Sequence, residues 1–572
     1  MHKQTVVDFK DLGQRLIFKN PLRELIAERL EEVIPVLRKV ESYQKQGYYV
    51  VGYLSYEASK AFEPKCQVHQ RQLSGEYCAY FTVHETAVQD IFPLTYNDVV
   101  MPKHWDSLTS KKVYEEAISE IHHQIRHGNT YQVNYTVQLK SGVETDSFAI
   151  YNRLVVEQGA AYNIYVAHDD FAVVSASPEL FFEKKQRVLR TRPMKGTTKR
   201  GKNSSEDLAQ RNWLEQDVKN RAENMMIVDL LRNDMGRISE IGSVTVTKLC
   251  QLERYSTVWQ MTSTIESHLK IDTDLVDVFT ALFPCGSITG APKLSTMDTI
   301  YRLENEPRGV YCGTVGICLP NGDCIFNVAI RTLQIYRSQA IYGVGGGITW
   351  DSQWQDEYEE TCQKSAILYR QQKQFDLITT GKICEGKLTF LEEHLQRLLE
   401  SSDYFDYSFD KDKARRNIEE ALKGLDKQQN YRMRIRLENS GQLHLDTEEL
   451  ADLPKTFLKA KLVERKVLLD QPFTFFKTSY RPHISTQGSD QIFISPEGYL
   501  QETSIANLIL EIDGEWLTPP AKVGLLEGIY RNYLIKSGKV KEVLLTREDL
   551  KKAQQVYACN AVRGLYPLEI VD

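Results

Sequence analysis

Residues 191–201 read Thr-Arg-Pro-Met-Lys-Gly-Thr-Thr-Lys-Arg-Gly and set one lysine, Lys195, beside a glycine turn. Pro193 fixes φ two residues before the lysine, and Gly196 permits a close backbone approach to whatever the lysine faces. Taken alone, the stretch also suits a basic surface turn, because further lysine and arginine residues follow at once. The rest of the chain has to decide between these two interpretations.

The composition is that of a globular protein. The chain has 572 residues, of which 42% are hydrophobic and 26% charged, and its formal net charge is −6. This length predicts roughly two to four domains. This negative net charge provides no overall positive potential that would attract nucleic acid. Without an apolar run of membrane-spanning length or a basic-apolar leader, we expect a cytoplasmic protein that acts on small molecules and binds neither nucleic acid nor membrane.

The cysteines carry no recognisable chemistry. The chain has ten, and none falls in a C-x-x-C pair, so neither a zinc site nor a disulfide framework is predicted. Residues 316–320 (GICLP) are similar to the G-x-C-x-G elbow of glutamine amidotransferases, but Pro320 replaces the second glycine. We therefore expect Cys318 to be a strand residue and the chain to lack a glutaminase of its own.

Hydrophobic periodicity predicts strands and helices in irregular alternation over the first two thirds of the chain. The expected helices span 22–48, with a kink or split at Pro35, then 111–127, 148–158, most of 206–234, and 353–372. The expected strands span 48–56, 131–139, 162–168, 171–175, 311–317, 324–333 and 340–345. Residues 345–347, all glycine, read as a turn that can press N–H groups against an anion. The spacing favours an α+β arrangement of large sheets over a doubly wound fold.

The pattern changes near residue 374. A short strand at 375–380 and a helix at 391–405 are followed by many short strands and one late helix at 526–537. We therefore expect one domain over residues 1–372, divided into an N-terminal segment (1–105) and a core (106–372), and a second domain over residues 374–572.

Carboxylates in the first domain suit a metal. Clustered carboxylates without histidine favour a hard cation such as Mg²⁺. The alternative is that these residues are simply solvated helix faces. The candidates are Glu223, Glu357 and Glu360 in helical settings, with a separate Glu179 and the cations Arg331 and Lys364.

Seven motifs in chain order resemble the chorismate-utilising enzymes, which comprise anthranilate synthase component I, aminodeoxychorismate synthase component I, and isochorismate and salicylate synthases. The resemblance implies a large two-sheet chorismate-binding domain with flanking helices. The motifs are SPE (177–179), RPMKGT (192–197), AENMMIVDLLRND (222–234), GSITGAPK (286–293), YCGTVG (311–316), AIRT (329–332) and GGGI…EYEETCQK (345–364).

The resemblance also implies roles for individual residues. Glu223, Glu357 and Glu360 match the acidic positions around Mg²⁺, which makes the ring carboxylate of chorismate an electron sink. Glu179 matches a general acid/base near the departing 4-hydroxyl, a role that needs a raised pKa. The positions that match substrate-binding residues are Gly196, Thr197, Tyr311, Arg331, Gly345, Gly347 and Lys364.

Position 195 discriminates within the family. Enzymes similar to anthranilate synthase carry alanine there, whereas aminodeoxychorismate synthases carry a lysine that attacks C2 of chorismate before ammonia attacks C4. Gln132 agrees with ammonia as the nucleophile, since water-using salicylate synthases have a lysine base at that position. Gln260 stands where many relatives carry histidine, which leaves open how the leaving group is assisted.

The second domain resembles the fold-type IV pyridoxal-phosphate enzymes, which include aminodeoxychorismate lyase and are built from two α+β subdomains. Lys477, in FKTSYR (476–481), matches the Schiff-base lysine, and Arg397, in HLQRL (394–398), matches the phosphate-binding arginine. Glu502 matches the partner of the pyridine nitrogen. The loop GLLEGIYR (524–531) matches the backbone phosphate site, with cofactor-binding amides expected at Gly528 and Ile529.

Several positions of this domain depart from the pattern. Ile484 and Ser485 replace a usual tyrosine and aspartate, and Cys559-Asn560-Ala561 stands where Thr-Asn-Ser is common. Two hydroxyl groups near the phosphate are thereby lost, at about 1 kcal/mol each. We expect weaker binding of pyridoxal phosphate; an inactive domain that serves as a scaffold is the alternative.

Together the two resemblances predict p-aminobenzoate, and hence folate, synthesis. The first domain would convert chorismate and ammonia, supplied by a separate glutaminase subunit, into 4-amino-4-deoxychorismate. The second would eliminate pyruvate. Two alternatives are an anthranilate synthase component I with an unrelated aminotransferase appended, and a non-catalytic protein built from two decayed enzymes.

Overall fold

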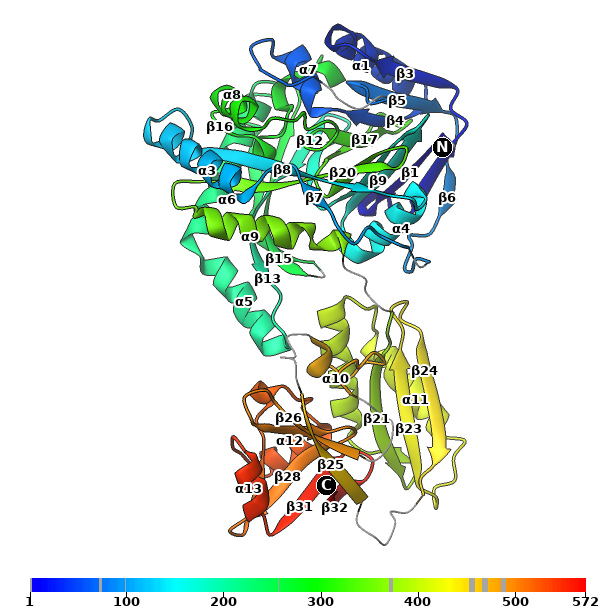
Figure 1. Cartoon of the computed structure of the whole chain (residues 1–572). Helices are drawn as coiled ribbons and strands as arrows, with labels where there is room; N and C mark the ends of the chain where they lie inside the picture. The colour runs from blue at the N-terminus through cyan, green and yellow to red at the C-terminus, as the bar shows by residue number, and fades with distance from the viewer. Residues whose placement is uncertain are drawn as a thin grey trace. The chain divides into compact units, whose positions relative to one another are not determined.

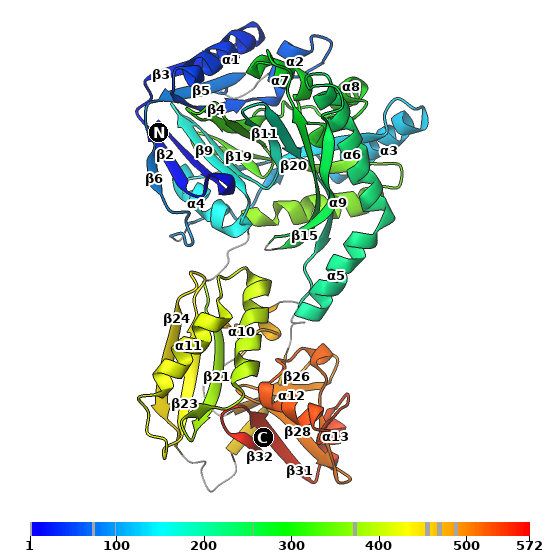
Figure 2. The ribbon, with the colours of Figure 1, turned by 180° about the vertical axis from the view of Figure 1, so that it is seen from behind.

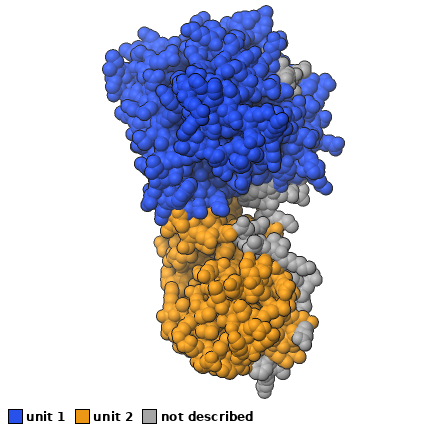
Figure 3. Space-filling view, turned by 60° about the vertical axis from the view of Figure 1, so that its left-hand side comes forward, with its two compact units in different colours: residues 1–199, 210–372 blue, residues 200–209, 373–572 orange. Residues whose placement is uncertain are grey.

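The computed structural model describes residues 3–70, 75–97, 99–255, 257–369, 374–451, 458–465, 472–484 and 490–571. The chain forms two compact units, coloured separately in Figure 3. One comprises residues 1–199 and 210–372, and the other comprises residues 200–209 and 373–572. Nothing in the sequence pattern indicates that residues 200–209 belong with the second unit.

Two ten-stranded antiparallel sheets form the first unit (Figures 1 and 2). The first has the order β16-β8-β20-β19-β10-β9-β1-β2-β6, with β7 on β8. Its strands are β1 (Gln4–Phe9), β2 (Arg15–Lys19), β6 (Val88–Asp90), β7 (Asp106–Ser107), β8 (Gln132–Gly142), β9 (Tyr162–His168), β10 (Phe171–Ser177), β16 (Gly290–Ala291), β19 (Thr332–Tyr336) and β20 (Gln339–Ile348).

The second sheet has the order β13-β15-β12-β11-β18-β17-β4-β5-β3, with β14 on β15. A core cluster that includes Val7 and Ile164 of the first sheet and Val51 and Val315 of the second lies between the two. The strands are β3 (Arg23–Ala27), β4 (Tyr49–Leu54), β5 (Ala79–His84), β11 (Leu180–Lys185), β12 (Val188–Arg192), β13 (Met194–Lys199), β14 (Thr245–Arg254), β15 (Val258–His268), β17 (Thr314–Cys318) and β18 (Cys324–Val328).

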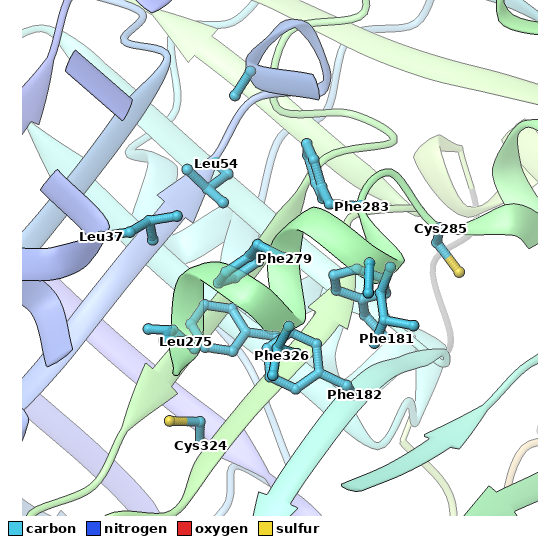
Figure 4. Close-up of a cluster of buried hydrophobic side chains, with 14 of the residues drawn as sticks. Leu37, Leu54, Phe181, Phe182, Leu275, Phe279, Phe283, Cys285, Cys324 and Phe326 are labelled. Carbon is cyan, nitrogen blue, oxygen red and sulfur yellow. The ribbon is translucent and has the colours of Figure 1, made fainter. Parts of the chain in front are cut away.

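Helices cover the outer faces of both sheets. On the second sheet, Phe279 packs among other phenylalanines, including Phe182 and Phe326 (Figure 4). On the first, Ile118 and Leu154 belong to the core cluster under two helices. The helices are α1 (Leu30–Lys45), α2 (Ser59–Phe62), α3 (Lys111–Arg126), α4 (Ser147–Gln158), α5 (Ser204–Gln216), α6 (Val218–Gly236), α7 (Leu275–Leu282), α8 (Lys293–Leu303) and α9 (Trp354–Ser365).

The single helix expected over 22–48 is wrong at its start. Residues 23–27 form β3 against β5, because Leu25 and Ala27 alternate into the core with period two. The helix α1 begins at Leu30 and runs through Pro35 as one element. The helices expected at 111–127 and 148–158 are confirmed within a residue. The helical stretch 206–234 is divided at Asp217, whose carboxylate caps α6 by accepting from the Asn220 N–H.

The turn expected at 345–347 is also wrong, because all three glycines lie inside β20, paired with β8. A Cβ at Gly345 would lie 2.1 Å from the Tyr135 carbonyl oxygen, so glycine serves a close strand approach here. The strand expected at 324–333 is broken between β18 and β19, with Arg331 at φ +52°. The strand expected at 311–317 begins only at Thr314, and the helix expected at 353–372 ends as an α-helix at Ser365.

The second unit contains two sheets, as two α+β subdomains require. The four-stranded sheet, order β22-β21-β23-β24, packs against α10 and α11. Its elements are β21 (Leu377–Cys384), β22 (Lys387–Leu388), α10 (Leu391–Phe405), α11 (Lys411–Leu422), β23 (Tyr431–Leu437) and β24 (Leu443–Glu449). The helix predicted over 391–405 is confirmed at both ends.

The eight-stranded sheet has the order β27-β26-β25-β32-β31-β28-β29-β30. Its elements are β25 (Leu458–Glu464), β26 (Asp490–Ile494), β27 (Leu500–Thr503), β28 (Asn507–Ile512), β29 (Glu515–Thr518), α12 (Ile529–Lys536), β30 (Lys541–Glu542), α13 (Arg547–Lys552), β31 (Gln555–Asn560) and β32 (Gly564–Val571). The late helix expected at 526–537 is present but shorter. The predicted α+β class is confirmed.

Residues 200–209 are fixed within the second unit by polar contacts. Arg200 pairs with Asp207 at 2.6 Å and lies over the Tyr404 ring, 4.4 Å from its centroid. The Tyr404 hydroxyl donates to the Gly201 carbonyl oxygen at 2.6 Å. Within the described ranges, no helix is long and apolar enough to cross a membrane.

Candidate functional site

Lys195 lies on β13, next to an irregularity in its pairing with β15. Gly196 has φ +93°, a conformation that suits glycine, and lets the strand bend directly after the lysine. A Cβ at Gly347 would lie 2.7 Å from Lys195 Nζ and 2.0 Å from Gln132 Nε2. The lysine amine of the second sheet therefore rests against the backbone of β20 and beside the β8 side chain Gln132, both in the first sheet.

Glu179 is the buried acid of this site, with a side chain 2% exposed between β10 and β11. Burial raises the pKa of its carboxyl to about 7, against the opposing effects of a Ser287 hydrogen bond and the Lys195 charge. Burial lowers the pKa of Lys195, and the nearby Lys364 charge lowers it further, while Glu223 and Glu179 oppose both. The two groups are thus shifted toward a protonated acid and a neutral amine.

Three carboxylates face the same region from two helices. Glu223 lies on α6, and Glu357 and Glu360 lie one turn apart on α9. Burial raises the pKa values of Glu223 and Glu357, and the Glu360 charge raises both further. Glu360 itself pairs with Lys364 at 2.7 Å, which lowers its pKa.

The three carboxylates are not assembled as a ready metal cluster. Across the stretches of chain that the structure describes, no group of three or more His, Cys, Asp or Glu side chains is arranged to hold a metal ion. The charge of Glu360 nevertheless raises the pKa values of Glu223 and Glu357, and a divalent cation relieves repulsion of this kind between carboxylates. An all-oxygen donor set of this kind fits Mg²⁺.

The side-chain amide of Gln132 is buried and unpaired among the described residues. Its side chain is fully buried at the start of β8, and neither Nε2 nor Oε1 has a partner within the described residues. Buried amides are almost always hydrogen-bonded, since leaving one unpaired costs free energy. An amide left unpaired beside the Lys195 amine is therefore positioned to bind a ligand.

The expected substrate-binding cations lie together. The Arg331 guanidinium donates to the Lys364 carbonyl oxygen, and Lys364 Nζ donates to the Gly345 carbonyl oxygen at 2.9 Å. A Cβ at Gly346 would lie 3.3 Å from Glu357 Oε2 and 3.5 Å from Lys364 Nζ, so α9 presses its charged side chains against β20. The arrangement brings Arg331, Lys364 and the glycine backbone into one site.

Tyr311 reaches the same strand two residues earlier. Its ring occupies the space where a Cβ at Gly343 would lie, within 2.1 Å of that position, and the side chain is 5% exposed. Glycine at 343 therefore makes room for the tyrosine. Because Gly343 and Gly345 point to the same face of β20, the ring borders the candidate site.

Gln260 holds the Lys195 turn, a role that the sequence did not indicate. The Thr197 hydroxyl donates to Gln260 Oε1 at 2.8 Å, and Gln260 Nε2 donates to the Gly196 carbonyl oxygen at 2.9 Å. The pairing places Thr197 directly opposite Gln260 on β15. The sequence shows that position 260 has glutamine where many relatives carry histidine. Only the strand register shows that Gln260 contacts the Lys195 turn.

In the second unit, Lys477 lies close to a group of arginines. Burial, and after it the charges of Arg397, Arg481, Arg434 and Arg432 in that order, lower the pKa of Lys477 to about 7. Its Nζ donates to Thr380 Oγ1 on β21 at 3.4 Å. At a pKa of about 7, roughly half of these amines are neutral at pH 7, and the neutral amine is the form that Schiff-base chemistry requires.

Three of the expected cofactor residues, Arg397, Gly528 and Ile529, meet at one corner of the second unit. Arg397 of α10 donates to the Glu527 carbonyl oxygen, directly before Gly528 and the N-terminus of α12 at Ile529. A Cβ at Gly528 would lie 2.0 Å from Asn507 Oδ1, which explains the glycine. The arginine and the first amides of α12 together suit a phosphate.

Glu502 stands apart from that corner. It is 3% exposed, lies 3.6 Å from Arg481 and 3.9 Å from Arg465, and accepts from the Leu526 N–H at 3.2 Å. Sequence reasoning missed both arginines, because their nearness to Glu502 depends on how separate strands pack. A buried carboxylate beside a neutral-leaning lysine and a phosphate corner fits pyridoxal phosphate.

The departures from the pyridoxal-enzyme pattern can be located only for some residues. Cys559 is fully buried on β31, where burial raises its thiol pKa to about 12. Asn560 Oδ1 accepts from the N–H groups of Val562 and Arg563, and so closes the turn that contains Ala561. Ile484 is half-buried, whereas Ser485 lies outside the described residues.

Comparison with protein families identifies both units. A family model described as chorismate binding enzyme matches residues 3–370, and the chain therefore belongs to that family. A second model, described as amino-transferase class IV, matches residues 376–461 and 479–571, so the chain also carries a class IV aminotransferase domain. Lys477 falls between the two segments that the second model matches.

Individual relatives match just under half of the chain. The chain is 38% identical over 257 residues to aminodeoxychorismate synthase component 1 of Bacillus subtilis, which covers 45% of this chain and 55% of the relative. It is 36% identical over 261 residues to anthranilate synthase component 1 of Lactococcus lactis, covering 46% and 57%. The chain thus matches little more than half the length of these relatives.

A solved structure supports the architecture of the first unit. Anthranilate synthase component I from Streptococcus pneumoniae superposes with a TM-score of 0.55 at 25% sequence identity. The match covers 64% of this chain and 92% of that chain.

Proposed function

We propose that the chain makes p-aminobenzoate in two steps. The first unit converts chorismate and ammonia into 4-amino-4-deoxychorismate, and the second eliminates pyruvate from that product. The observation that carries the proposal is the juxtaposition of a neutral-leaning Lys195 with Gly347, Gln132 and a Glu179 carboxyl whose pKa is raised to about 7.

In the first step Lys195 is the nucleophile. Its neutral Nζ attacks C2 of chorismate, the two ring double bonds shift, and the C4–O bond breaks as Glu179 protonates the hydroxyl, which leaves as water. The proton released from the new C2–N bond returns to the Glu179 carboxylate. Ammonia then attacks C4, the double bonds shift back, and Lys195 leaves C2 as a neutral amine because Glu179 returns the proton to its nitrogen. The new C4 ammonium gives a proton back to Glu179.

Substrate charge is neutralised by the surrounding groups. Arg331 and Lys364 suit the carboxylates of chorismate, and the backbone of Gly345 and Gly347 permits close approach. The Thr197 hydroxyl already donates its proton to Gln260. Thr197 would therefore contact a chorismate carboxylate through its backbone N–H. Mg²⁺ held by Glu223, Glu357 and Glu360 would withdraw electrons through the ring carboxylate.

In the second step Lys477 moves protons. With a pKa near 7 its amine can take a proton and return it at neutral pH. Arg397, Gly528 and Ile529 would hold the phosphate of the cofactor, and the Glu502 carboxylate would keep its pyridine nitrogen protonated. Pyridoxal phosphate, when bound, supplies the electron sink that stabilises charge on the carbon skeleton of the substrate.

Ammonia comes, in this proposal, from a separate glutamine amidotransferase subunit. The relative from Bacillus subtilis is named as component 1 of its synthase. Cys318, in the sequence most similar to a glutaminase elbow, is fully buried at the end of β17 and has a raised pKa because of that burial. A buried thiol of that kind is a poor nucleophile.

The test is product identity after incubation of the full chain with chorismate, ammonium and Mg²⁺, with and without pyridoxal phosphate. We expect 4-amino-4-deoxychorismate without the cofactor and p-aminobenzoate with it. Anthranilate as the main product would instead support the second candidate, an anthranilate synthase component 1 activity, which the relative from Lactococcus lactis makes worth testing.

A further inference from the structure

Three arginines share one face of β23. Met433, Ile435 and Leu437 alternate with them and are buried in the core against α10 and α11. Side chains of a strand alternate between its two faces, so the arginines all project from the opposite face. They are Arg432, Arg434 and Arg436.

The arginine face is also the face of Lys477. Thr380 of β21 lies directly opposite Arg434 in the strand register, and residues opposite one another in an antiparallel pair project to the same side. The hydroxyl of Thr380 is the group to which Lys477 Nζ donates, at 3.4 Å. Figure 1 shows β21 and β23 side by side. The charge of Arg434 is among those that lower the pKa of Lys477.

Among the described residues, only the middle arginine of the row forms no ion pair, because Asp446, which lies opposite Arg434 on β24, pairs with Arg436 instead. Arg432 pairs with Glu448 at 2.8 Å. Arg436 pairs with Asp446 at 3.2 Å and with Asp376 at 3.3 Å. Arg434 is exposed and makes no hydrogen bond or ion pair with any residue in the described ranges. A guanidinium fork beside the reactive lysine is therefore free to bind a planar anion such as a carboxylate.

That anion is not the phosphate of the cofactor. Arg397 on α10 contacts the Glu527 carbonyl oxygen next to the N-terminus of α12, so the phosphate corner is built from other elements. Arg434 belongs to the sheet on which the Lys477 amine rests. Its position suits a group carried by the molecule that reacts there.

We propose that Arg434 binds a carboxylate of the substrate at Lys477, and so selects cyclic amines that carry a carboxylate away from the amine. 4-Amino-4-deoxychorismate belongs to this class, with its ring carboxylate at C1 and its amine at C4. The inference rests on the proposed function, because it assumes that an amine reacts at a cofactor bound to Lys477. It adds Arg434 as the residue that determines which amines bind.

A ligand-by-residue cycle tests the assignment. The full chain loaded with pyridoxal phosphate is titrated with p-aminobenzoate and with aniline, which share an aromatic amine and differ in the carboxylate, while the visible cofactor spectrum is followed. We expect Arg434→Ala to weaken p-aminobenzoate roughly 10- to 100-fold, as loss of a charged hydrogen bond predicts, and to leave aniline unchanged. Intrinsic differences between the two amines cancel when variant and wild type are compared.

Matched variants separate binding from structure. Arg434→Lys should recover some of the affinity for p-aminobenzoate, and Arg436→Ala, on the same face of the same strand, should retain the wild-type ratio of the two affinities. With 4-amino-4-deoxychorismate, Arg434→Ala should raise KM while kcat stays within a few-fold. An Arg434→Ala protein that binds both amines like wild type, or loses both equally, overturns the inference.

Failure of the proposed function gives a different result. A wild-type protein that binds p-aminobenzoate through Arg434 but releases no pyruvate from 4-amino-4-deoxychorismate would contradict the lyase step and leave the carboxylate site supported. A wild-type protein that releases pyruvate, with the same KM in Arg434→Ala, would support the lyase step and contradict the site.

Discussion

At the chorismate site, burial shifts the pKa values of single residues more than ion pairing does. Glu179 is 2% exposed, and its pKa is raised to about 7 although the positive charge of Lys195 opposes the shift. The pKa of Lys195 falls although three carboxylates oppose that change. In both groups desolvation outweighs attraction, and desolvation favours the uncharged form of each. An uncharged acid and an uncharged amine are the forms that covalent substitution needs.

Replacing Lys195 by alanine should abolish the covalent route. We expect kcat for 4-amino-4-deoxychorismate formation to fall on the order of 10³-fold, because the nucleophile is lost. The dissociation constant of chorismate, measured by calorimetry with Mg²⁺ present, should change less than about threefold, since Arg331 and Lys364 are untouched. Full synthase activity in this variant would show that Lys195 is not the nucleophile.

The pH dependence should carry the signature of Glu179. Its protonated form is the acid, so kcat should decline about tenfold per pH unit above about 7. The residual activity of Glu179→Gln should lack this alkaline limb. In the unfolded chain the carboxyl titrates near its ordinary pKa of 4.5, so the folded state is disfavoured progressively as pH rises from 4.5 to about 7. Glu179→Gln should therefore be more stable than wild type at pH 8, measured by urea unfolding.

Gln260 should act by holding the lysine turn. Its amide bonds both Gly196 and Thr197, so Gln260→Ala should lower kcat roughly tenfold by loosening the nucleophile. A positioning role predicts that KM for chorismate changes little and that the pH profile keeps its shape. Stopped-flow measurement over a pH series checks this. A new ionisation in the profile of Gln260→Ala would count against the positioning role.

At the scale of elements, side chains from both sheets and from α9 converge on strand β20. Three consecutive glycines leave no side chains between this strand and the residues that approach it: Gln132 from β8, Lys195 from β13 and Lys364 from α9. A strand with side chains at these positions could not have all three approach. The glycine run is therefore part of a strand that gives side chains of the site room to approach, and is not a turn.

Substitution within this strand should separate activity from stability. In Gly347→Ala the new Cβ would meet Gln132 Nε2 at 2.0 Å and Lys195 Nζ at 2.7 Å, and displacing those side chains should cost about 100-fold in kcat/KM. Gly142→Ala, at the far end of the paired strand β8, has its nearest neighbour at 4.0 Å and serves as the control. Melting temperatures of the two variants should agree within a few degrees. Equal activities would exclude close approach as the reason for Gly347.

What the sequence could predict depends on how local the information is. The helix 391–405 was predictable at both ends because its apolar face and flanking residues are local. The strand 23–27 was not, since two buried residues fit either a strand or the first turn of a helix until β5 pairs with it. Lys195 was predictable from its motif. The role of Arg434 was not predictable, because it depends on the strand register that places this residue opposite Thr380.

At the scale of the whole molecule, each of the two unrelated folds contains one lysine whose pKa is lowered in the same way. Lys195 and Lys477 both have pKa values lowered first by burial and then by neighbouring cations. Each lysine rests against a strand of a different sheet, one in each unit. The second compact unit is not contained in residues 373–572 alone, because residues 200–209 belong to it as well. Tests of either activity are therefore best made with the full chain.

Two full-length single variants should complement each other in a mixture. Lys477→Ala should accumulate 4-amino-4-deoxychorismate from chorismate and ammonium, because only the second lysine is lost. Lys195→Ala should make nothing from chorismate but should convert supplied 4-amino-4-deoxychorismate into p-aminobenzoate and pyruvate. Mixed together, the two proteins should produce p-aminobenzoate after a lag, because the intermediate must leave one protein and diffuse to the other. Chromatography of the products over time, with the double variant as the blank, measures the lag. Failure of the mixture, with each half-reaction intact, would mean that the intermediate does not pass through solution.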